Sequence, residues 1–342
     1  MQELLGRLGA LDPAASQGLR VIACFDELMA GHVGTEGLLS AAAALAGRPV
    51  GVKRSADAPT VRVDPSGDRL PAAPPPETAL ESDGILVWIE GAASGVNDAI
   101  ILERLALALH LRYEQGSGLE PRDLAVLFDE SADVAERRDA ATRRGIPSGA
   151  LFRAIAAPLF AVWRTHPTGP EDVVRTDAGP VHVAVVPADS AVAATPLGIG
   201  TAVERDELPA SFRSALLALR LADGAEDGIF RADDLGVLAA TLADRPLGAP
   251  MDADEAAVAE LAEAHPWAPA TLDALVHSSS VRDAARSAGI HHSTMTARIG
   301  VIASAFGFAP LDGWGRTRMA VAYLRWRVRT SHVLELPPPA SR

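Results

Sequence analysis

The residues best placed to perform a defined chemistry lie near the C-terminus, where two short helices joined by a tight turn are predicted. Ser280 can cap the first of these helices, and Asp283 follows at the spacing of a capping box. Gly289 stands where this helix must end and the chain must turn, because glycine adopts a positive φ angle at little cost. Ser293 and Thr294 are candidate caps for the second helix. This order of elements is that of a helix-turn-helix.

The second helix is expected to have one apolar and one polar face. Met295, Ile299 and Ile302 recur at helical spacing, which predicts that they pack inward. The side chains left outward can form hydrogen bonds with base edges in a major groove or with phosphates. We expect direct base contacts from His292, Ser293, Thr296 and Arg298, and phosphate contacts from Thr294, Arg316 and Arg318. The alternative is an ordinary helical hairpin at the end of a domain.

Charge is distributed unevenly along the 342 residues, whose formal net charge is −13. Residues 271–332 contain eight arginines and three aspartates, a local excess of five positive charges. Residues 251–270 contain five acidic residues and no Lys or Arg. Because phosphate contacts need cations locally rather than on average, this pattern predicts an acidic body with a basic C-terminal module.

The length suits two or three domains, and several features favour a cytoplasmic protein. No apolar run approaches the ~20 residues needed to span a bilayer, so no membrane partner is expected. The segment 1–5 is acidic and lacks the basic leader of an export signal. Cys24 is the single cysteine and cannot form an internal disulfide, which fits a reducing compartment. Its place in an apolar helical stripe favours core packing over redox sensing.

The first third of the chain is predicted to form an α/β domain. Helices are expected at residues 19–30, 35–46 and 98–113, with Thr35 and Asn97 as caps of the last two. Strands are expected at residues 49–53, 60–63 and 84–90, with a turn at 65–68. The proline-rich segment 70–76 is expected to be irregular.

A second α/β unit is predicted in the middle of the chain. A boundary at 116–118 and a charged helical connector at 121–144 precede it. Strands are expected at residues 152–160, 173–175, 181–186, 197–203 and 228–231. Helices are expected at residues 209–222 and from Asp233 as cap to residue 244. A linker at 248–252 leads to the helical C-terminal module.

The C-terminal residues resemble the helix-turn-helix domain of the PucR/CdaR family of transcription regulators. The resemblance is carried by Ala284-Ala285, Gly289–Ile299, Phe306-Gly307 and the closing helix Gly315–Leu324. In that family the recognition helix opens with His-x-x-Thr and has an arginine four residues after the threonine. His291, Thr294 and Arg298 stand at those places. The same stretch is also similar to the smaller Fis-type helix-turn-helix.

The resemblance extends over most of the chain. Gly198-Ile-Gly200, residues 208–219 and residues 233–236 are similar to the degenerate GGDEF-like domain of these regulators. Residues 25–28, 48–51 and 98–105 resemble the GAF-type domain of actinobacterial members, although three strands are fewer than that fold has. The resemblance implies a multidomain α+β chain. Its parts would be a GAF-like α/β sensory or dimerisation domain at 1–115, a helical connector at 116–147, a degenerate GGDEF-like α/β domain at 148–247, an all-α PucR-type helix-turn-helix DNA-binding domain at 250–335 and a disordered tail at 336–342.

No catalytic centre is predicted. The middle domain lacks the Gly-Gly-Asp/Glu-Glu-Phe turn and the paired carboxylates of an active cyclase, and Gly198-Ile-Gly200 is expected to close a strand against a helix. No P-loop motif is present, and the nine histidines show no metal-ligand spacing. We therefore expect neither a metal nor a cofactor. A small-molecule effector could be held by Phe25, Met29, Trp88 and Ile100, although a plain core needs the same residues.

The sequence thus predicts a homodimeric, sequence-specific DNA-binding transcription regulator, responsive to an effector, with double-stranded DNA as its partner. The alternative is a small-molecule sensor or scaffold that acts through protein partners without DNA contact. DNA binding requires the polar face of the second helix to be exposed. A docking unit would instead present a continuous apolar face there.

Overall fold

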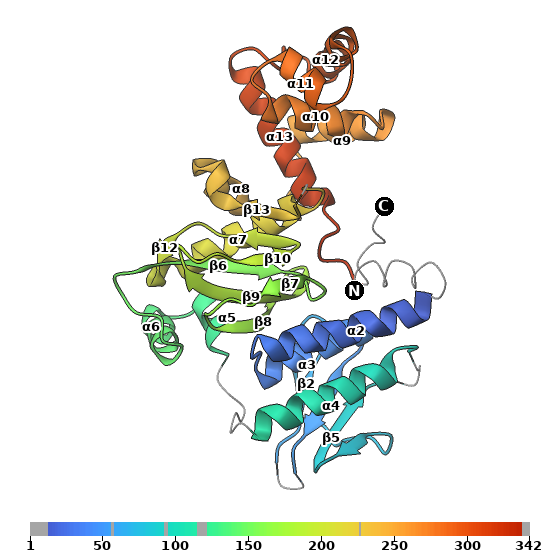
Figure 1. Ribbon diagram of the computed structural model, residues 1–342, viewed down its shortest axis with the longest axis vertical. Coiled ribbons are helices and arrows are strands. Elements are labelled where there is room, and N and C mark those ends of the chain that lie inside the picture. Colours follow the sequence, from blue (N-terminus) through green and yellow to red (C-terminus); the bar gives the residue numbers. More distant parts are fainter. Residues whose placement is uncertain (1–12, 56–57, 92–94, 115–121, 226, 337–342) are drawn as a thin grey trace. The chain divides into compact units, whose positions relative to one another are not determined.

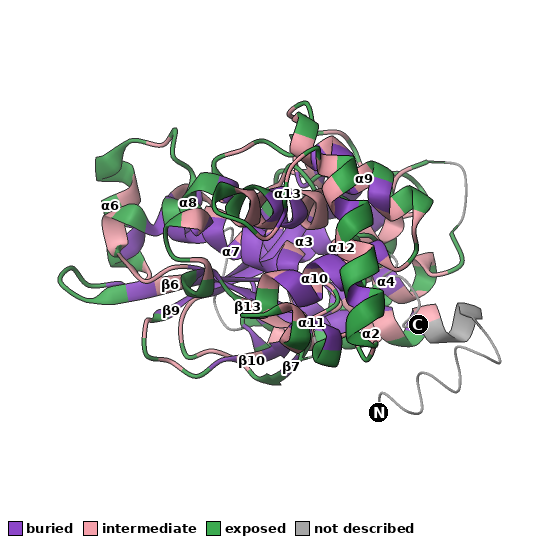
Figure 2. Ribbon diagram, turned by 90° about the horizontal axis from the view of Figure 1, so that it is seen from above, coloured by how far each residue is buried: buried purple, intermediate pink, exposed green. Residues whose placement is uncertain are grey.

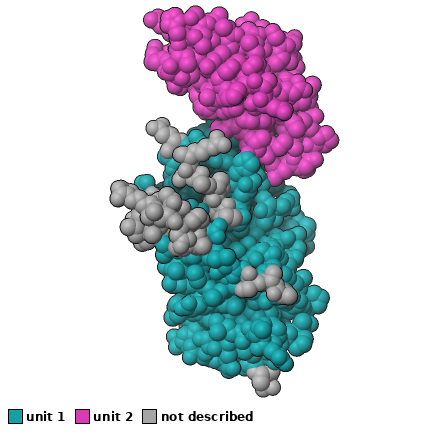
Figure 3. All heavy atoms as spheres, turned by 90° about the vertical axis from the view of Figure 1, so that its right-hand side faces the viewer, with its two compact units in different colours: residues 1–243, 332–342 teal, residues 244–331 magenta. Residues whose placement is uncertain are grey.

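The computed structural model describes residues 13–55, 58–91, 95–114, 122–225 and 227–336, and the side chains from residue 17 onward within them. Two compact units are coloured separately in Figure 3: unit 1 comprises residues 1–243 and 332–342, and unit 2 comprises residues 244–331. The chain therefore leaves unit 1 after Ala243 and returns to it at His332. The predicted boundary at 116–118, the segment 1–5 and, apart from Leu336, the predicted tail lie outside the described residues.

The N-terminal part of unit 1 is an antiparallel five-stranded sheet with three helices on one face (Figure 1). The sheet order is β3-β2-β1-β5-β4, with β1 Val50–Lys53, β2 Val61–Val63, β3 Arg69–Leu70, β4 Leu80–Ser82 and β5 Ile85–Ile89. The helices are α2 Pro13–Ala30, α3 Thr35–Ala46 and α4 Asp98–Glu114. Side chains alternate along each strand, so that Val50, Val52 and Val87 pack with the helices in one core.

The prediction of three strands in this part is wrong, because β3 and β4 also belong to the sheet. β3 overlaps the start of the segment expected to be irregular. Both strands are short and mostly exposed, and neither has the apolar alternation by which a strand is recognised in a sequence. Thr35 is also not the cap of α3, since Gly34 occupies that position. The edges of the sheet are thus set by pairing with β2 and β5 rather than by local sequence.

The remainder of unit 1 is built on a second sheet, with α7 Leu208–Ala222 packed on it. Its order is β13-β11-β6-β9-β8, and the short β12 also pairs with β6. The strands are β6 Leu151–Ala157, β8 Glu171–Thr176, β9 Gly179–Pro187, β11 Leu197–Ile199, β12 Val203–Glu204 and β13 Ile229–Arg231, while β7 Val162–Thr165 and β10 Ala193–Thr195 form a separate ribbon. A Cβ added at Gly198 would lie 2.2 Å from the carbonyl oxygen of Ala215 in α7. The expectation that Gly198-Ile-Gly200 closes a strand against a helix is therefore confirmed.

The charged connector is helical and consists of two helices, α5 Asp123–Phe128 and α6 Val134–Arg143. Asp133 caps the second helix by accepting a hydrogen bond from the backbone amide of Ala135. The ring of Phe128 stacks on that of Phe212 in α7, with 4.3 Å between centroids. The connector therefore packs into the core of the second sheet instead of bridging two bodies.

Three elements in this part also differ from the prediction, and one of them is the strand expected at 197–203, which is divided into β11 and β12. The strand expected at 152–160 ends at Ala157. Asp233 lies inside a short 3-10 helix, Ala232–Leu235, and Gly236, with a φ of 55°, separates it from α8 Val237–Ala243. The Asp233 carboxylate binds Arg153 instead of capping a helix. A side-chain partner distant in sequence thus replaces the local cap.

Unit 2 is entirely helical, and its elements are α9 Ala253–Ala264, α10 Ala268–His277, α11 Val281–Ser287, α12 His292–Phe306 and α13 Trp314–Thr330. Val258, Leu272, Met295, Ile302 and Met319, which come from four of these helices, are fully buried in one core. The prediction of a mixed α/β chain that ends in helices is confirmed. Among the described residues, no helix is both long and apolar enough to cross a bilayer.

Cys24 lies in the N-terminal core, where 2 % of its surface is exposed. Burial raises the pKa of the thiol to about 12, so it stays protonated at neutral pH. Core packing is therefore the role of this residue, as the sequence indicates.

Candidate nucleic-acid interface

The turn between α11 and α12 has the geometry that the sequence predicts. Ser280 caps α11, because its hydroxyl oxygen accepts a hydrogen bond from the backbone amide of Asp283 at 3.2 Å. The Asp283 carboxylate accepts hydrogen bonds in return from the hydroxyls of Ser280 and Ser279, which hold the pKa of the carboxyl below its usual value. Gly289 follows with a φ of 63°, and the backbone amide of Ile290 donates to the carbonyl of Ala285.

The start of α12 differs from the prediction in one respect. Its cap is His291, whose Nδ1 accepts a hydrogen bond from the backbone amide of Ser293, so neither Ser293 nor Thr294 is the cap. A histidine rarely takes this role, which is why the sequence favours the hydroxyl residues. The inner stripe is as predicted: Met295 and Ile302 are buried, and Ile299 packs beside them.

The polar residues at the start of α12 are exposed, and Figure 2 shows the exposed face of this helix. His292, Ser293, Thr294 and Thr296 all lie on it. The hydroxyl of Thr296 donates to the carbonyl of His292 at 3.0 Å, which leaves its lone pairs and methyl group directed to solvent. The face therefore offers small hydrogen-bonding groups at the helix end that enters a groove first in this motif.

Arg298 does not lie on that face. Its side chain is half-buried, donates to the hydroxyl of Thr271 at 3.0 Å and covers the ring of Trp267 at 4.9 Å from the centroid. Both partners come from the start of α10. The expectation that Arg298 points outward beside Thr296 is therefore wrong: a long side chain can fold back over its own helix toward a π face.

The two arginines assigned to phosphate are also engaged within unit 2. Arg316 donates to the carbonyl of Ser278 at 3.0 Å, which holds the start of α13 against the end of α10. Arg318 forms a bidentate pair with Asp254 at 2.8 and 2.9 Å and lies over the ring of Phe308. The hydrogen bonds to Asp254 raise the pKa of the Arg318 guanidinium. Their positive charges are thus partly satisfied inside the unit.

Three ion pairs join α9 and its cap to α13 in unit 2. They join Arg318 to Asp254, Arg325 to Asp252 and Arg329 to Glu255. Residues 244–331 contain nine arginines and nine Asp or Glu residues, so the formal charge of the unit is zero. The acidic stretch 251–270 therefore balances the basic stretch that follows it, and the predicted basic module is neutral as a folded unit.

Two cations beside the turn were absent from the predicted site. Arg282 and Arg286 lie on α11 with exposed side chains. Arg286 forms an exposed pair with Asp283 at 3.3 Å, an interaction of little energetic weight. Arg282 and Arg286 stand two residues before and two residues after the buried Ala284, a helical spacing that could have shown that these side chains point away from the core.

The four residues considered as a ligand wall do not share one cavity. Phe25 is fully buried, and Met29 and Ile100 pack against the same helical core. Trp88 pairs in register with Gly51 and covers it, because a Cβ added there would lie 2.2 Å from the indole ring. Val87 precedes Trp88, and Val50 precedes Gly51. Both valines pack in the core with the helices, so Trp88 lies on the opposite face of the sheet.

Comparison with known proteins adds little. No family model matches the chain, and no curated protein matches it. The crystal structure of a regulator of polyketide synthase expression from Bifidobacterium adolescentis is 14 % identical to it, with a TM-score of 0.24, over 61 % of this chain and 97 % of that chain. A TM-score of this size supports no conclusion about fold or activity.

Proposed function

We propose that this chain is a sequence-specific DNA-binding transcription regulator. The observation that carries the proposal is the α11–Gly289–α12 unit, which presents an exposed polar face on the first turns of α12. This arrangement is the one by which a helix-turn-helix reads a major groove. The proposal includes a cytoplasmic location and no catalytic step.

The proposed contacts follow from exposure. His292, Ser293 and Thr296 would touch base edges, and Thr294 with Arg282 and Arg286 would touch phosphates. Arg298 would act indirectly, by fixing α12 against α10. Because one small helical module buries too little surface for specific affinity at physiological salt, the proposal includes a homodimer that binds two half-sites.

The relationship proposed is to the PucR/CdaR family, with a GAF-like domain at the N-terminus and a degenerate GGDEF-like domain in the middle. It rests on His291, Thr294 and Arg298, which keep the spacing of the family's recognition helix. In this chain the first of these residues caps α12 and the last packs under it. Two of the three motif positions would therefore orient the helix rather than contact a base.

A second candidate function is docking to a protein partner. Trp314, at the start of α13, is 81 % exposed, which is unusual for a side chain of this size. Among the large apolar residues of α12, however, only Val301 is exposed. An apolar face that continues along α12 is what docking would require, so the exposed polar face favours DNA.

The test is a fluorescence-anisotropy titration of the full chain with a pool of genomic DNA fragments at two salt concentrations, followed by sequencing of the bound fragments. Enrichment of one palindromic or repeated sequence, with weaker binding at higher salt, is the expected result. If neither the full chain nor residues 244–331 bind any fragment, the DNA proposal is wrong and partner docking becomes the better explanation.

Once a site is enriched, Thr296→Val separates base reading from folding. The change removes one hydroxyl from the exposed face and should weaken binding to the enriched site by about 1–3 kcal/mol, with binding to random DNA unchanged. Ser304→Ala is the matched control, because Ser304 is an exposed hydroxyl near the other end of the same helix. Equal losses in the two variants would contradict the assignment.

A further inference from the structure

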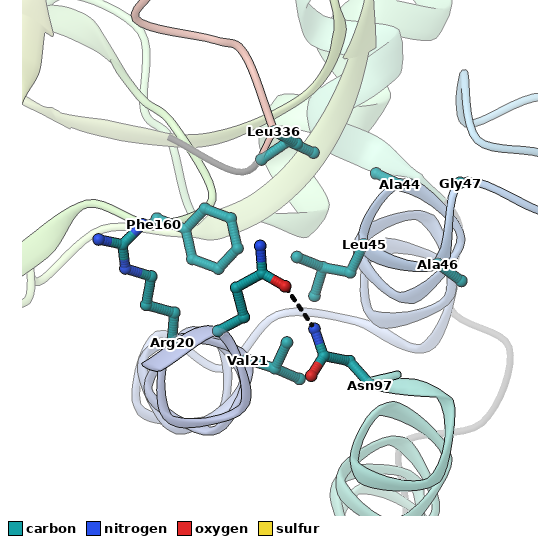
Figure 4. A pocket seen from close by; sticks show the side chains of 10 residues that line it. Arg20, Val21, Ala44, Leu45, Ala46, Gly47, Asn97, Phe160 and Leu336 are labelled. Atoms are coloured by element: carbon teal, nitrogen blue, oxygen red, sulfur yellow. Dashed lines mark hydrogen bonds between the residues drawn. The ribbon is translucent and has the colours of Figure 1, made fainter. Parts of the chain in front are cut away.

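The last turn of α2 meets the second sheet of unit 1 at a cluster of four titratable side chains. Near its start, α2 borders a half-open hollow that Phe160 also lines (Figure 4). Near its end, Glu27 lies 2.8 Å from the ring of His166, which follows β7. The cluster continues to Glu171 of β8 and His182 of β9, whose side chains are almost fully buried. Together, the two glutamates and the two histidines form the α2 junction, which the proposed DNA interface does not include.

The α2 junction is held by contacts at hydrogen-bond distance. His166 lies between two carboxylates: its Nε2 is 2.8 Å from Oε2 of Glu27, and its Nδ1 is 3.2 Å from Oε2 of Glu171. The Nε2 of His182 lies 2.9 Å from the same oxygen of Glu171. Gly31, the residue after α2, packs so closely here that an added Cβ would lie 2.3 Å from that oxygen. The end of α2 is therefore fastened to β8 through polar groups.

The number of protons in the α2 junction decides whether these contacts are favourable. An ionised carboxylate can only accept a hydrogen bond, and a neutral imidazole carries one N–H. His182 contacts Glu171 through Nε2, and one N–H satisfies that contact. His166 faces a carboxylate at each nitrogen, so it can donate to both only as the imidazolium. When His166 is neutral, the lone pair of one nitrogen points at a carboxylate instead.

The surroundings of the ring favour a positive charge. The side chain of Glu171 is 2 % exposed, and a buried carboxylate is costly without a positive partner. Asp172, the next residue of β8, is also buried, and burial raises the pKa of its carboxyl. The ring of Trp163 stacks on that of His166, with 5.3 Å between centroids and 17° between planes. A π face at this distance attracts a protonated imidazole.

The charged groups on the neighbouring helices have partners of their own. Arg112 of α4 donates to the carbonyl of Met29, and another of its guanidinium nitrogens lies 3.2 Å from Nδ1 of His32. Arg122, which precedes α5, lies 3.6 Å from Glu36 of α3. The ring between the two carboxylates of the α2 junction is thus the group placed to supply their positive charge.

We propose that His166 makes the α2 junction a proton-dependent contact between α2 and the second sheet. With a proton on each nitrogen, the ring joins Glu27 to Glu171 and holds the end of α2 on β8. Loss of one proton removes one of these hydrogen bonds. Because the closed junction binds this proton more tightly than the open one, closure weakens as pH rises. Histidine changes its charge between about pH 5 and pH 8, so the transition falls in that range.

This inference does not depend on DNA binding, so its test uses the full chain without DNA. Hydrogen exchange detected by mass spectrometry at about pH 6 and about pH 8 measures the protection of residues 23–31, after correction for the chemical exchange rate at each pH. We expect protection about tenfold higher at the lower pH, because a hydrogen bond to a charged group is lost at the higher one. Helix α7 is the internal reference. Equal protection of residues 23–31 at the two pH values would overturn the proposal.

Glu27→Gln distinguishes a proton-dependent contact from an ordinary polar one. The new amide can donate to the lone pair of Nε2 while Nδ1–H of His166 donates to Glu171, so a neutral ring satisfies both neighbours. This variant should therefore keep its protection at both pH values. A pH dependence equal to that of the unchanged chain would show that the proton between the carboxylates is not the cause.

A second variant tests the ring itself. His166→Gln should lower protection at the lower pH to the value found at the higher pH. His110→Gln is the matched control, because His110 also lies beside two carboxylates, those of Asp83 and Glu114, but on α4 rather than in the α2 junction. Persistence of the pH dependence in His166→Gln, or its loss in the control, would contradict the assignment. Circular dichroism shows whether each variant is folded, and Glu27→Gln, which keeps the shape of the side chain, tests the proposal even if His166→Gln is not.

Discussion

Arg298 illustrates how a residue can keep its place in a motif and change its task. Spacing alone puts it beside Thr296 on the outer face of α12, whereas its guanidinium lies against Trp267 and Thr271. These contacts stabilise the folded unit 2, so their loss should lower its free energy of unfolding in the absence of DNA.

Arg298→Ala should lower the free energy of unfolding of unit 2 by about 1–2 kcal/mol, since one hydrogen bond and one cation–π contact are lost. Urea unfolding of the variant and of Arg286→Ala measures this. The control should change by less than about 0.5 kcal/mol, because Arg286 is exposed. Were both variants equally stable, the packing role of Arg298 would be refuted.

Arg286 is instead expected to act on DNA. Arg286→Gln should leave sequence preference intact and reduce the slope of log affinity against log salt by about 0.9 per protomer, the value for one lost phosphate contact. Titrations at several salt concentrations give the slope. Arg175→Gln removes the same charge from β8 in unit 1 and should leave the slope unchanged, and a change there would mean that the slope reports net charge rather than contact.

At the scale of elements, the pairing of α9 with α13 holds unit 2 together. Glu255 is almost fully buried, and one carboxylate oxygen accepts a hydrogen bond from Arg329 at 2.7 Å, while the other lies 3.4 Å from Arg245. A charge at a buried site destabilises the fold when it has no partner of opposite charge. Removing the Glu255 carboxylate leaves Arg329 and Arg245 without that partner.

Glu255→Ala should therefore destabilise unit 2 by about 3 kcal/mol, measured by chemical unfolding. Glu260→Ala on the same helix is the control, because its side chain is exposed and its loss should be neutral. Asp254→Ala should fall between them, since Arg318 is half exposed and solvent weakens that pair. A neutral result for Glu255→Ala would show that the pairs add nothing to packing.

The same elements show what a sequence can and cannot provide. Caps, turns and inner stripes are local, so Ser280, Gly289 and Met295 could be placed correctly from neighbours within a few residues. Partners far along the chain leave no such signal, which is why the contacts of Arg298 with Thr271 and of Asp233 with Arg153 were missed. The edge strands β3 and β4 could not be predicted for a related reason, because they depend on hydrogen bonds to β2 and β5 and not on their own sequence pattern. The hollow lined by Val21, Leu45, Asn97, Phe160 and Leu336 draws its walls from five places in the chain, and no one of them predicts it.

For the whole molecule, the distribution of charge between the units matters more than the total. The formal charge of unit 2 is zero, so the net charge of −13 belongs entirely to unit 1. The net charge of unit 1 therefore repels DNA, whereas unit 2 has no net charge. Salt is expected to screen this repulsion as well as the contacts with phosphates.

Residues 244–331 alone should bind random DNA more tightly than the full chain at low salt. The difference should shrink as ionic strength rises, because the Debye length falls from ~30 Å at 0.01 M to ~8 Å at 0.15 M. Anisotropy titrations of both proteins with one random duplex measure this, with circular dichroism to show that the fragment is folded. A difference that stays constant with salt would point to a cause other than charge.

The course of the chain has a mechanical consequence. Unit 2 begins after Ala243, and the chain re-enters unit 1 at His332, whose backbone amide donates to Asp223 at 2.8 Å while Val333 and Leu334 pack into the core of the second sheet. A unit that two segments of the chain join to the rest has fewer independent motions than a unit joined by one segment. In a homodimer, two copies of unit 2 restricted in this way would lose less rotational entropy when they bind adjacent half-sites. Removing the contacts of residues 332–334 with unit 1 would leave unit 2 joined by a single segment and would restore the lost freedom of motion.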